Sequence, residues 1–420
     1  MTAIRTIIST GPGRLHLFEA AISLKKIGME VSIITGWIPG RLFSDKMLNF
    51  MGKFVGRAGN LAHGLRKRTP GELSKYEIKS CGASEFFTRG MMKLSSYHFI
   101  PYANSAVLGW KFFGLQSKKF IRNADIFHVR SGAGCAGAIE KARKQGMKII
   151  VDHSIAHPKE MERQMNKIFK RTQFENNKYT ETNPSDIFWE LVLEDCMKAD
   201  ILMVNSDYVK WSFIQEGYLA DRIKVVQLGV NSEFKNSKQE YNASDKIKLI
   251  FTGGFIERKG ALILLDAIKI LEDQKINFSL DVAGSLGSIK IPDWVKESKN
   301  IVFHGHVSQL KLSELLIASD IYIFPTYTEG AAQSVKEAMS VGLPVITTRQ
   351  SGSPIVHGEN GWLVENDNAE ALAGAILILS KDRKLQEKLG LEAAITIKEG
   401  HTWENFAKDV LKLYNEILLK

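Results

Sequence analysis

Short apolar runs of strand length alternate along the chain with longer spans in which apolar residues recur at helical spacing. In the first half, the apolar runs predict strands at 6–10, 31–35, 126–130, 148–152, 201–205 and 224–228. In the second half, they predict strands at 249–252, 278–282, 301–304, 321–324 and 344–347. Helical spans separate most of these runs, a pattern typical of βαβ units. The sequence therefore predicts an α/β fold with two Rossmann-like parallel-sheet domains that face each other across a cleft.

A polar stretch without periodicity separates the two series of strands and indicates a linker at 231–246. The predicted domains are thus 1–230 and 247–400, followed by a C-terminal helix at 401–420 that we expect to return to the first domain. Ligands of parallel sheets bind outside the carboxyl ends of the strands, and clefts between domains are favoured sites.

A basic insertion, at about 37–122, interrupts the alternation. Residues 41–70 carry seven Lys or Arg against the single acid Asp45, with apolar residues between them, and residues 89–122 carry six and no acid. Residues 1–210 have a net charge of +13 and the remainder −3, within a total of +10. The positive charge of residues 1–210 favours an anionic partner, either a membrane surface or an acidic acceptor. The alternative is a solvated insertion that covers one face of the first sheet.

The few cysteines and the hydropathy limit the class of protein further. Cys81, Cys135 and Cys196 form neither a disulfide framework nor a CxxC metal site. The chain has no run of 18 apolar residues and no pattern of a signal peptide at its beginning. We therefore expect a cytoplasmic protein, with peripheral attachment to the inner face of the membrane as one option for the basic half.

The most specific candidate chemistry lies at 325–345. Glu329 and Glu337 are eight residues apart, which on one helix corresponds to about 12 Å along the axis and roughly 80° in azimuth. They would not converge on one atom, so they suit neither a metal nor an acid/base pair. The backbone amides between them begin a predicted helix and suit a phosphate. Carboxylates at both ends and amides in the middle suggest a nucleotide-diphosphate sugar; two solvated glutamates on a surface helix are the alternative.

A second segment, 251–260, places two cations after a strand and a glycine turn. It reads Phe-Thr-Gly-Gly-Phe-Ile-Glu-Arg-Lys-Gly and precedes a predicted helix at 261–271. With Glu329, Glu337, the continuation through 345 and the segments 205–208, 228–231 and 357–364, the chain resembles the retaining glycosyltransferases of family 4 (glycosyl transferases group 1), which have the GT-B fold. The resemblance covers most of 200–380 and, more weakly, the N-terminal half.

The resemblance implies a role for each matching residue. Glu337 would hold the ribose diol of the donor, and Glu329 and His153 would act at the donor sugar as catalytic residues. Lys259, also expected to be catalytic, would neutralise the leaving diphosphate. The other donor-binding residues implied are Gly11, Gly13, Gly253, Arg258, Gly330, Ala331, Ala332, Gln333 and Ser334. The family often has an arginine where this chain has Gly254, so Arg258 or a cation of the basic half would replace it.

The histidines divide into a candidate and several alternatives. His153 follows the strand 148–152, where it is either an active-site residue or a satisfied histidine at a strand end. His128 and His16 are weaker candidates, and His157, directly before Pro158, is expected to cap a helix. His304 and His306 have the spacing of a metal pair but no third ligand nearby. We therefore expect no metal and no resident cofactor.

The predicted function is that of a retaining hexosyl transferase that uses a nucleotide-sugar donor and a saccharide or lipid-linked acceptor of cell-envelope polysaccharide synthesis. A non-catalytic relative of the same fold is one alternative. A nicotinamide-dependent enzyme is less favoured, because Gly11-Pro-Gly13 lacks the third glycine of GxGxxG and no acid closes the strand 31–35. A nucleic-acid partner is not expected, because the basic half contains no recognisable binding module.

Overall fold

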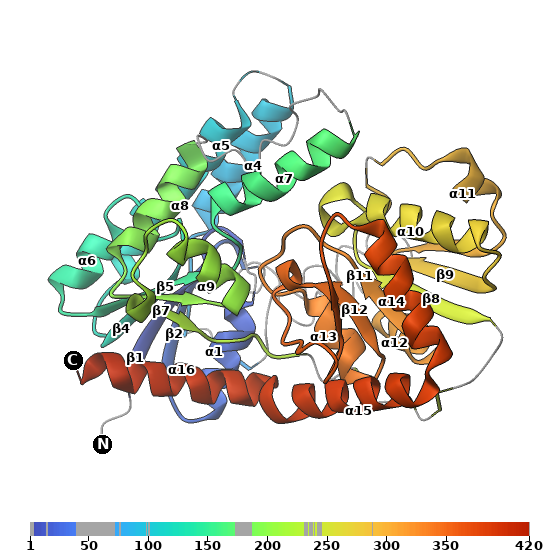
Figure 1. Cartoon of the computed structure of the whole chain (residues 1–420). Coiled ribbons are helices and arrows are strands. Elements are labelled where there is room, and N and C mark those ends of the chain that lie inside the picture. Colours follow the sequence, from blue (N-terminus) through green and yellow to red (C-terminus); the bar gives the residue numbers. More distant parts are fainter. Residues whose placement is uncertain are drawn as a thin grey trace, which may run out of the picture. The chain divides into compact units, whose positions relative to one another are not determined.

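The computed structural model divides into two compact units, each described by itself (Figure 1). The first contains residues 1–153, 183–203 and 407–420, and the second contains 154–182 and 204–406. The structure describes residues 4–13, 16–38, 72–74, 77–97, 99, 101–172, 187–230, 234, 238, 240–241, 246–287 and 289–419. The basic segment 41–70 and most of the predicted linker lie outside the described residues. The predicted domain limits at 230 and 247 stay a prediction.

The first sheet has seven strands in the order β3-β2-β1-β4-β5-β6-β7. Their bounds are β1 (Arg5–Ser9), β2 (Glu30–Thr35), β3 (Ile78–Ser80), β4 (Ile126–Arg130), β5 (Lys148–His153), β6 (Ile201–Val204) and β7 (Ile223–Val225). The pairs from β3 to β5 are parallel, with Ile7 opposite both Ser32 and Phe127. Side chains on both faces of these central strands are buried, as parallel sheets covered by helices require.

The second sheet has six parallel strands in the order β10-β9-β8-β11-β12-β13. Their bounds are β8 (Ile247–Thr252), β9 (Phe278–Ala283), β10 (Ile301–Gly305), β11 (Ile321–Phe324), β12 (Val345–Thr348) and β13 (Trp362–Val364). Both orders reverse direction beside the first strand of the sheet, β1 or β8, which is the Rossmann-like arrangement. The predicted α/β fold with two parallel sheets is therefore confirmed.

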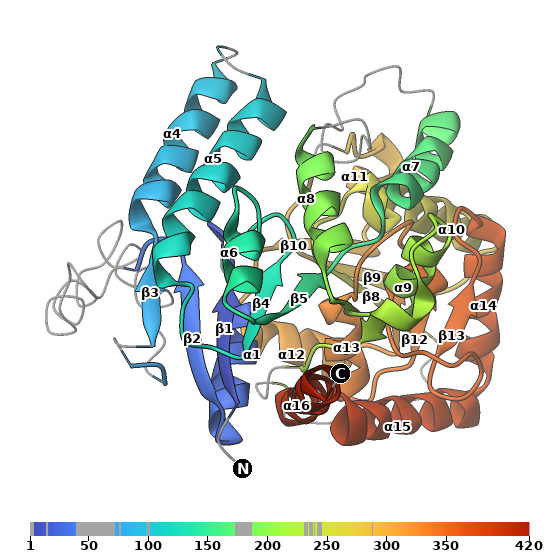
Figure 2. The same cartoon turned by 90° about the vertical axis from the view of Figure 1, so that its left-hand side faces the viewer.

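The helices of the first unit are α1 (Leu17–Lys26), α4 (Gly82–Ser96), α5 (Tyr102–Ser117), α6 (Ala138–Lys144) and α8 (Ile187–Lys198), with a 3₁₀ turn η2 (Lys118–Phe120). Figure 2 shows α4 and α5 side by side as a hairpin that extends away from the strands. The basic insertion thus contains two regular helices within the part of the chain that the structure describes.

The helices of the second unit are α7 (Pro158–Thr172), α9 (Asp207–Ile214), α10 (Ala261–Asp273), α11 (Asp293–Glu297), α12 (Gln309–Ala318), α13 (Gln333–Ser340), α14 (Ala369–Lys381) and α15 (Arg383–Gly400). Three 3₁₀ turns, η3 (Ala220–Arg222), η4 (Glu257–Lys259) and η5 (Arg349–Ser351), lie in its loops. The last helix, α16 (Trp403–Leu418), begins in this unit, and its residues from Ala407 onward group with the first. Among the described helices, none is both long and apolar enough to cross a bilayer.

Candidate active site

A glycine turn after β8 brings Arg258 and Lys259, the two cations predicted to bind the diphosphate, to the end of the neighbouring strand β11. Gly253 has φ 108° and Gly260 has φ 79°, conformations that glycine adopts without strain. A Cβ on Gly260 would lie 1.9 Å from the carbonyl oxygen of Pro325, so only glycine fits against the end of β11. Because β8 and β11 are paired and parallel, their carboxyl ends share one edge of the sheet. The turn therefore places Arg258 and Lys259 beside the loop that follows Pro325.

Arg258, Lys259 and Glu329 form one charge cluster in this loop. Arg258 Nη1 donates to the carbonyl oxygen of Thr328 at 2.6 Å and lies 2.9 Å from Glu329 Oε1. Lys259 Nζ lies 3.8 Å from the same oxygen and 5.6 Å from the centre of the Phe324 ring. All three charged side chains are only about one-fifth exposed. Two cations against one carboxylate leave an excess of positive charge, which suits an anion.

The helix α13 begins at the end of the same loop. The amide of Ala332 is one of the predicted phosphate-binding amides, but it donates to the carbonyl oxygen of Ser351 at 2.9 Å. It therefore already has a partner within the protein. The amides of Gln333 and Ser334 belong to the first helical turn, where no intrahelical acceptor exists. These two amides, together with the positive end of the helix dipole, are the better candidates for an anion.

Glu337 lies one turn into α13 and is partly buried. Tyr322 on β11 is fully buried and its hydroxyl lies 3.1 Å from Thr252 Oγ1. Burial raises the pKa of the Tyr322 phenol above its ordinary value, and the negative charges of Glu337 and Glu329 raise it further. Both glutamates are thus within electrostatic reach of one buried hydroxyl. Tyr322 could not be singled out from the sequence, because it lies within an apolar strand.

Gly330 is fixed by a close backbone approach within the second unit. A Cβ there would lie 1.8 Å from the carbonyl oxygen of Ser154 and 2.9 Å from Asn205 Nδ2. The carbonyl oxygen of Gly330 accepts a hydrogen bond from Ser206 Oγ at 2.5 Å. Since the segment after β6 holds Gly330 in this way, the loop from Glu329 to the start of α13 has a defined position.

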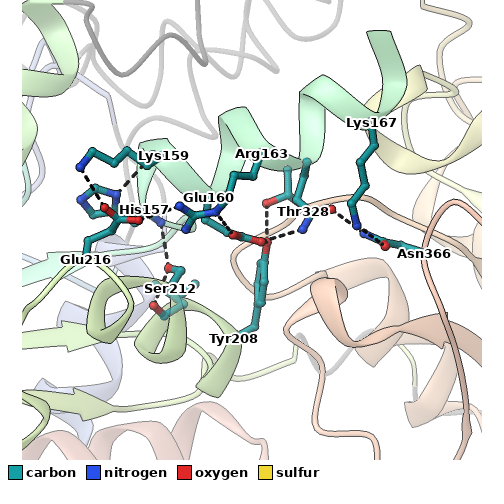
Figure 3. A network of polar contacts seen from close by, with 12 residues as sticks. His157, Lys159, Glu160, Arg163, Lys167, Tyr208, Ser212, Glu216, Thr328 and Asn366 are labelled. Atoms are coloured by element: carbon teal, nitrogen blue, oxygen red, sulfur yellow. Dashed lines mark hydrogen bonds and ion pairs between the residues drawn. The ribbon is translucent and has the colours of Figure 1, made fainter. Parts of the chain in front are cut away.

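A buried polar network on α7 reaches the same loop (Figure 3). Glu160 is 2% exposed and accepts hydrogen bonds from Arg163 Nε at 2.8 Å and Gln164 Nε2 at 2.7 Å. The hydroxyl of Tyr208, on α9, lies 3.3 Å from Glu160 Oε1 and 3.2 Å from Thr328 Oγ1. The network connects α7 and α9 to the residue preceding Glu329. Glu160 has no distinctive signal in the sequence, because a lone acid on an amphipathic helix is usually solvated.

The predicted donor residues of the first unit lie at the carboxyl end of β1. Gly11 has φ 75°, and a Cβ there would lie 2.8 Å from Trp110 Cζ3. A Cβ on Gly13 would lie 3.5 Å from Arg130 Nη1. Within its own unit, the close neighbour that requires glycine at 11 is therefore an indole ring. The roles of Gly11 and Gly13 toward a diphosphate stay predictions.

His153 ends β5 and is 2% exposed. Its Nδ1 lies 2.8 Å from Ser131 Oγ and 3.8 Å from the sulfur of Cys196. Both contacts are compatible with a satisfied histidine at a strand end, the alternative considered for this residue. Its catalytic role stays a prediction.

Asp152, the preceding residue, holds the two other histidines of this edge. His16 Nε2 lies 3.0 Å and His128 Nε2 3.5 Å from Asp152 Oδ2, and His128 Nδ1 lies 2.7 Å from the Tyr414 hydroxyl. Burial alone would raise the pKa of the Asp152 carboxyl, but the charges and hydrogen bonds of His16 and His128 outweigh it and hold that pKa well below its usual range. Asp152 is therefore a charged anchor of the first unit.

His157 and His304 have local partners. His157 Nδ1 accepts from the amide of Lys159 at 3.3 Å, in agreement with a cap at the start of α7, and burial lowers its pKa to about 4. His304 Nε2 lies 2.6 Å from Asp281 Oδ1. Among the residues that the structure describes, no group of three or more His, Cys, Asp or Glu is arranged to hold a metal ion.

Residues 232–395 match the family described as Glycosyl transferases group 1. The chain is also similar to an uncharacterized glycosyltransferase of Methanocaldococcus jannaschii, MJ1178, at 30% identity over 52% of this chain and 60% of that protein. The amylovoran biosynthesis glycosyltransferase AmsK of Erwinia amylovora is 26% identical over 51% of this chain and 58% of its own length. For the capsular polysaccharide biosynthesis glycosyltransferase CapM of Staphylococcus aureus, the values are 27%, 52% and 62%. These matches span about 60% of each relative.

Solved structures match over nearly the whole chain. Anabaena HepE in complex with UDP and glucose has a TM-score of 0.59 and 16% identity, with 98% of this chain and 100% of that chain covered. A mutant of Staphylococcus aureus TarM in complex with fondaparinux, alpha-GlcNAc-glycerol and UDP has a TM-score of 0.65 and 12% identity at the same coverage. At these identities the likeness concerns the fold. The chain has the fold of GT-B glycosyltransferases.

Proposed function

We propose that the protein is a retaining glycosyltransferase that moves a hexosyl group from a nucleoside-diphosphate sugar to an acceptor hydroxyl. The observation that carries the proposal is the cluster of Arg258, Lys259 and Glu329 beside the start of α13. It lies within the segment that matches the glycosyltransferase family and has an excess of positive charge. The HepE and TarM structures were solved with UDP, which supports a nucleotide as the ligand class.

The residues of the cluster would divide the work along the donor. When the bond between the anomeric carbon and the diphosphate oxygen breaks, negative charge grows on the diphosphate. Arg258, Lys259 and the first-turn amides of α13 would stabilise that charge, which lowers the barrier if they are in place beforehand. Glu337 would accept hydrogen bonds from the ribose diol and Glu329 from hydroxyls of the sugar. In this proposal the cations and amides would supply the positive charge, and no metal ion would be needed.

The acceptor is proposed from the named relatives. AmsK, CapM and the putative WcaL glycosyltransferase of Salmonella typhimurium are named for amylovoran, capsular polysaccharide and colanic acid biosynthesis. By analogy, we propose a saccharide or lipid-linked saccharide acceptor in cell-envelope polysaccharide synthesis. A lipid-linked acceptor would place the protein at the inner face of the membrane.

A donor screen that follows release of nucleoside diphosphate tests the proposal. UDP-, GDP- and ADP-sugars are compared, with NAD as the ligand of the alternative Rossmann enzyme. For the productive donor, Glu337→Ala should weaken binding about tenfold to a few hundredfold in calorimetry, since it removes charge-assisted hydrogen bonds of about 1.5–3 kcal/mol. Glu370→Ala, at an exposed position in the same unit, serves as the control.

The outcomes separate the alternatives. Release of a nucleoside diphosphate together with sugar transfer supports the transferase. Donor binding without release points to the non-catalytic relative, and binding of NAD alone points to the nicotinamide enzyme. Unchanged donor affinity in Glu337→Ala contradicts the role given to this residue.

A further inference from the structure

The hairpin of α4 and α5 is held firmly at its base in the first unit. A Cβ on Gly109 of α5 would lie 2.4 Å from Thr88 Oγ1 of α4. The backbone of α5 therefore packs directly against a side chain of α4. A Cβ on Gly114 would lie 2.4 Å from the carbonyl oxygen of Cys135, which shows how closely α5 packs on the rest of the unit. Figure 2 shows the other end of the hairpin extending away from the sheet. The hairpin therefore projects from the first unit and is anchored to it by close packing of α5.

The far end of the hairpin exposes large apolar side chains. We call Leu94, Tyr97, Phe99 and Tyr102 the hairpin tip; their exposed fractions are 44%, 61%, 75% and 44%. The amides of Tyr97 and Phe99 both donate to the carbonyl oxygen of Leu94, at 3.2 Å each, so the backbone that carries these rings is held at the chain reversal. Four large apolar residues gathered at one projecting end are more than the single exposed apolar residues usual on a soluble surface.

Beyond Glu85, the charged residues of the hairpin are all positive. Between Glu85 and Asp125 the sequence contains six Lys or Arg and no Asp or Glu. Arg89 pairs with Glu85 at 2.7 Å, whereas Lys93 lies exposed beside Leu94. Lys111 is exposed about midway along α5, and Lys119 and Arg122 are exposed just after its base end. Apolar rings with cations and without acids complement an anionic lipid surface.

We propose that the hairpin tip docks the protein on an anionic lipid bilayer. The rings of Tyr97, Phe99 and Tyr102 would lie at the headgroup level, where aromatic side chains are favoured. Lys93, beside the tip, would lie over the anionic headgroups and contribute about fivefold in affinity. This binding requires no donor and is independent of the proposed glycosyl transfer. It assigns the membrane contact to α4 and α5, in the half of the chain with a net charge of +13.

A fluorescent probe at the tip tests whether it enters lipid. Phe99→Cys is labelled with the polarity-sensitive dye NBD, and Leu310→Cys, at a 72% exposed position in the second unit, is the control. The native cysteines are buried, and burial raises the pKa of Cys81 and Cys135 to about 12, so they should label slowly. Vesicles of phosphatidylcholine and phosphatidylglycerol at low salt should raise and blue-shift the emission from position 99 and leave position 310 unchanged. High salt or pure phosphatidylcholine should abolish the change.

Sedimentation with the same vesicles measures the contribution of the side chains. The double change Tyr97→Ser and Phe99→Ser should weaken vesicle binding at least tenfold, and Lys93→Glu about fivefold or more. Leu310→Ser should bind like the unchanged protein. Circular dichroism checks the fold of each variant. Nucleoside diphosphate release in the double variant should match that of the unchanged protein with a water-soluble acceptor, which separates docking from catalysis.

Three results would overturn the proposal. The unchanged protein could stay in the supernatant with anionic vesicles at low salt. The emission of the dye at position 99 could remain that of a dye in water while the protein is bound to the vesicles. Alternatively, the protein could dimerise without lipid and lose the dimer in the double variant, which would make the tip an interface between two copies.

Discussion

Two lysines of the second unit have opposite surroundings. Lys259 is 22% exposed and faces Glu329, a setting in which a cation can meet a ligand. Lys336 is fully buried, and its Nζ donates to the carbonyl oxygen of Leu228 at 2.6 Å. Burial lowers the pKa of Lys336 to about 7. The family resemblance implies a role for Lys259 and none for Lys336, although Lys336 directly precedes Glu337 on α13.

Replacing Lys336 should change how stability depends on pH. Below pH 7 the lysine is charged in both states, so the folded protein bears the full cost of burying the charge. Between about pH 7 and its unfolded value near 10.4, only the unfolded state keeps the proton, so raising the pH relieves this cost. The difference in the free energy of unfolding between Lys336→Met and the unchanged protein should therefore favour the variant most at pH 7 and below. By pH 10 this difference should shrink by a few kcal/mol. Urea unfolding at several pH values measures the difference; a constant difference would contradict the buried charge.

Lys259→Ala should lower kcat as well as raise KM. The ammonium lies where the leaving diphosphate is proposed, and charge grows there during transfer, so its loss affects the transition state more than the bound donor. Lys269→Ala is the control, because Lys269 is an exposed lysine of α10 that pairs with Asp273 at 2.8 Å. Steady-state kinetics with the productive donor provide the measurement. A rise in KM alone would reduce Lys259 to a binding residue.

At the scale of elements, the network of Glu160, Tyr208 and Thr328 should fix the loop that carries Glu329. Tyr208→Phe removes the hydroxyl between Glu160 and Thr328 and should cost about 1 kcal/mol of stability. It should also lower kcat/KM several-fold, because Glu329 directly follows Thr328. Tyr241→Phe is the matched control, since its hydroxyl donates to the carbonyl oxygen of Gly342 at 2.6 Å, outside this loop. If both variants lose stability alike and neither loses activity, the network is only structural.

Most strands of the two sheets could be predicted from the sequence, whereas two strands of three residues and the helices α4 and α5 of the insertion could not. The apolar runs at 126–130 and 321–324 coincide with β4 and β11, because burial on both faces leaves a continuous apolar signal. The strands β3 and β13 have three residues each and were missed. Ile78, Lys79 and Ser80 form a strand only through pairing with 33–35 on β2. That pairing has no local signature in so short a segment.

At the scale of the whole molecule, the predictable part of the site is the part built by adjacent strands. Arg258, Lys259 and Glu329 follow β8 and β11, whose carboxyl ends meet in the sheet, so motif and topology together bring them close. Glu160 and Tyr208 reach the same loop from segments more than 100 residues away, through side-chain contacts that no spacing reveals. For the same reason, the sequence did not indicate that 154–182 group with the second unit.

The last part of α16 supplies core side chains to the first unit, to which it belongs by contacts. Val410, Leu413, Tyr414 and Ile417 are each at most 5% exposed. The Tyr414 hydroxyl lies 2.7 Å from Nδ1 of the fully buried His128 on β4. Burial of each large side chain contributes about 1.5–3 kcal/mol, so the four together contribute about 6–12 kcal/mol. That sum is comparable to the whole free energy of unfolding of a typical domain, about 5–15 kcal/mol.

A chain that ends at Phe406 should therefore lose the fold of the first unit and keep that of the second. Limited proteolysis followed by mass spectrometry should find cleavage throughout 4–153 and protection of 246–402, and calorimetry should show a smaller unfolding enthalpy. A chain that ends at Leu418 is the control, because it removes only Leu419, which is 88% exposed, and the final lysine. Protection of 4–153 in the shorter chain would show that the first unit folds without α16. Loss of both units would show that the second depends on the first, so that the two unfold as one cooperative structure.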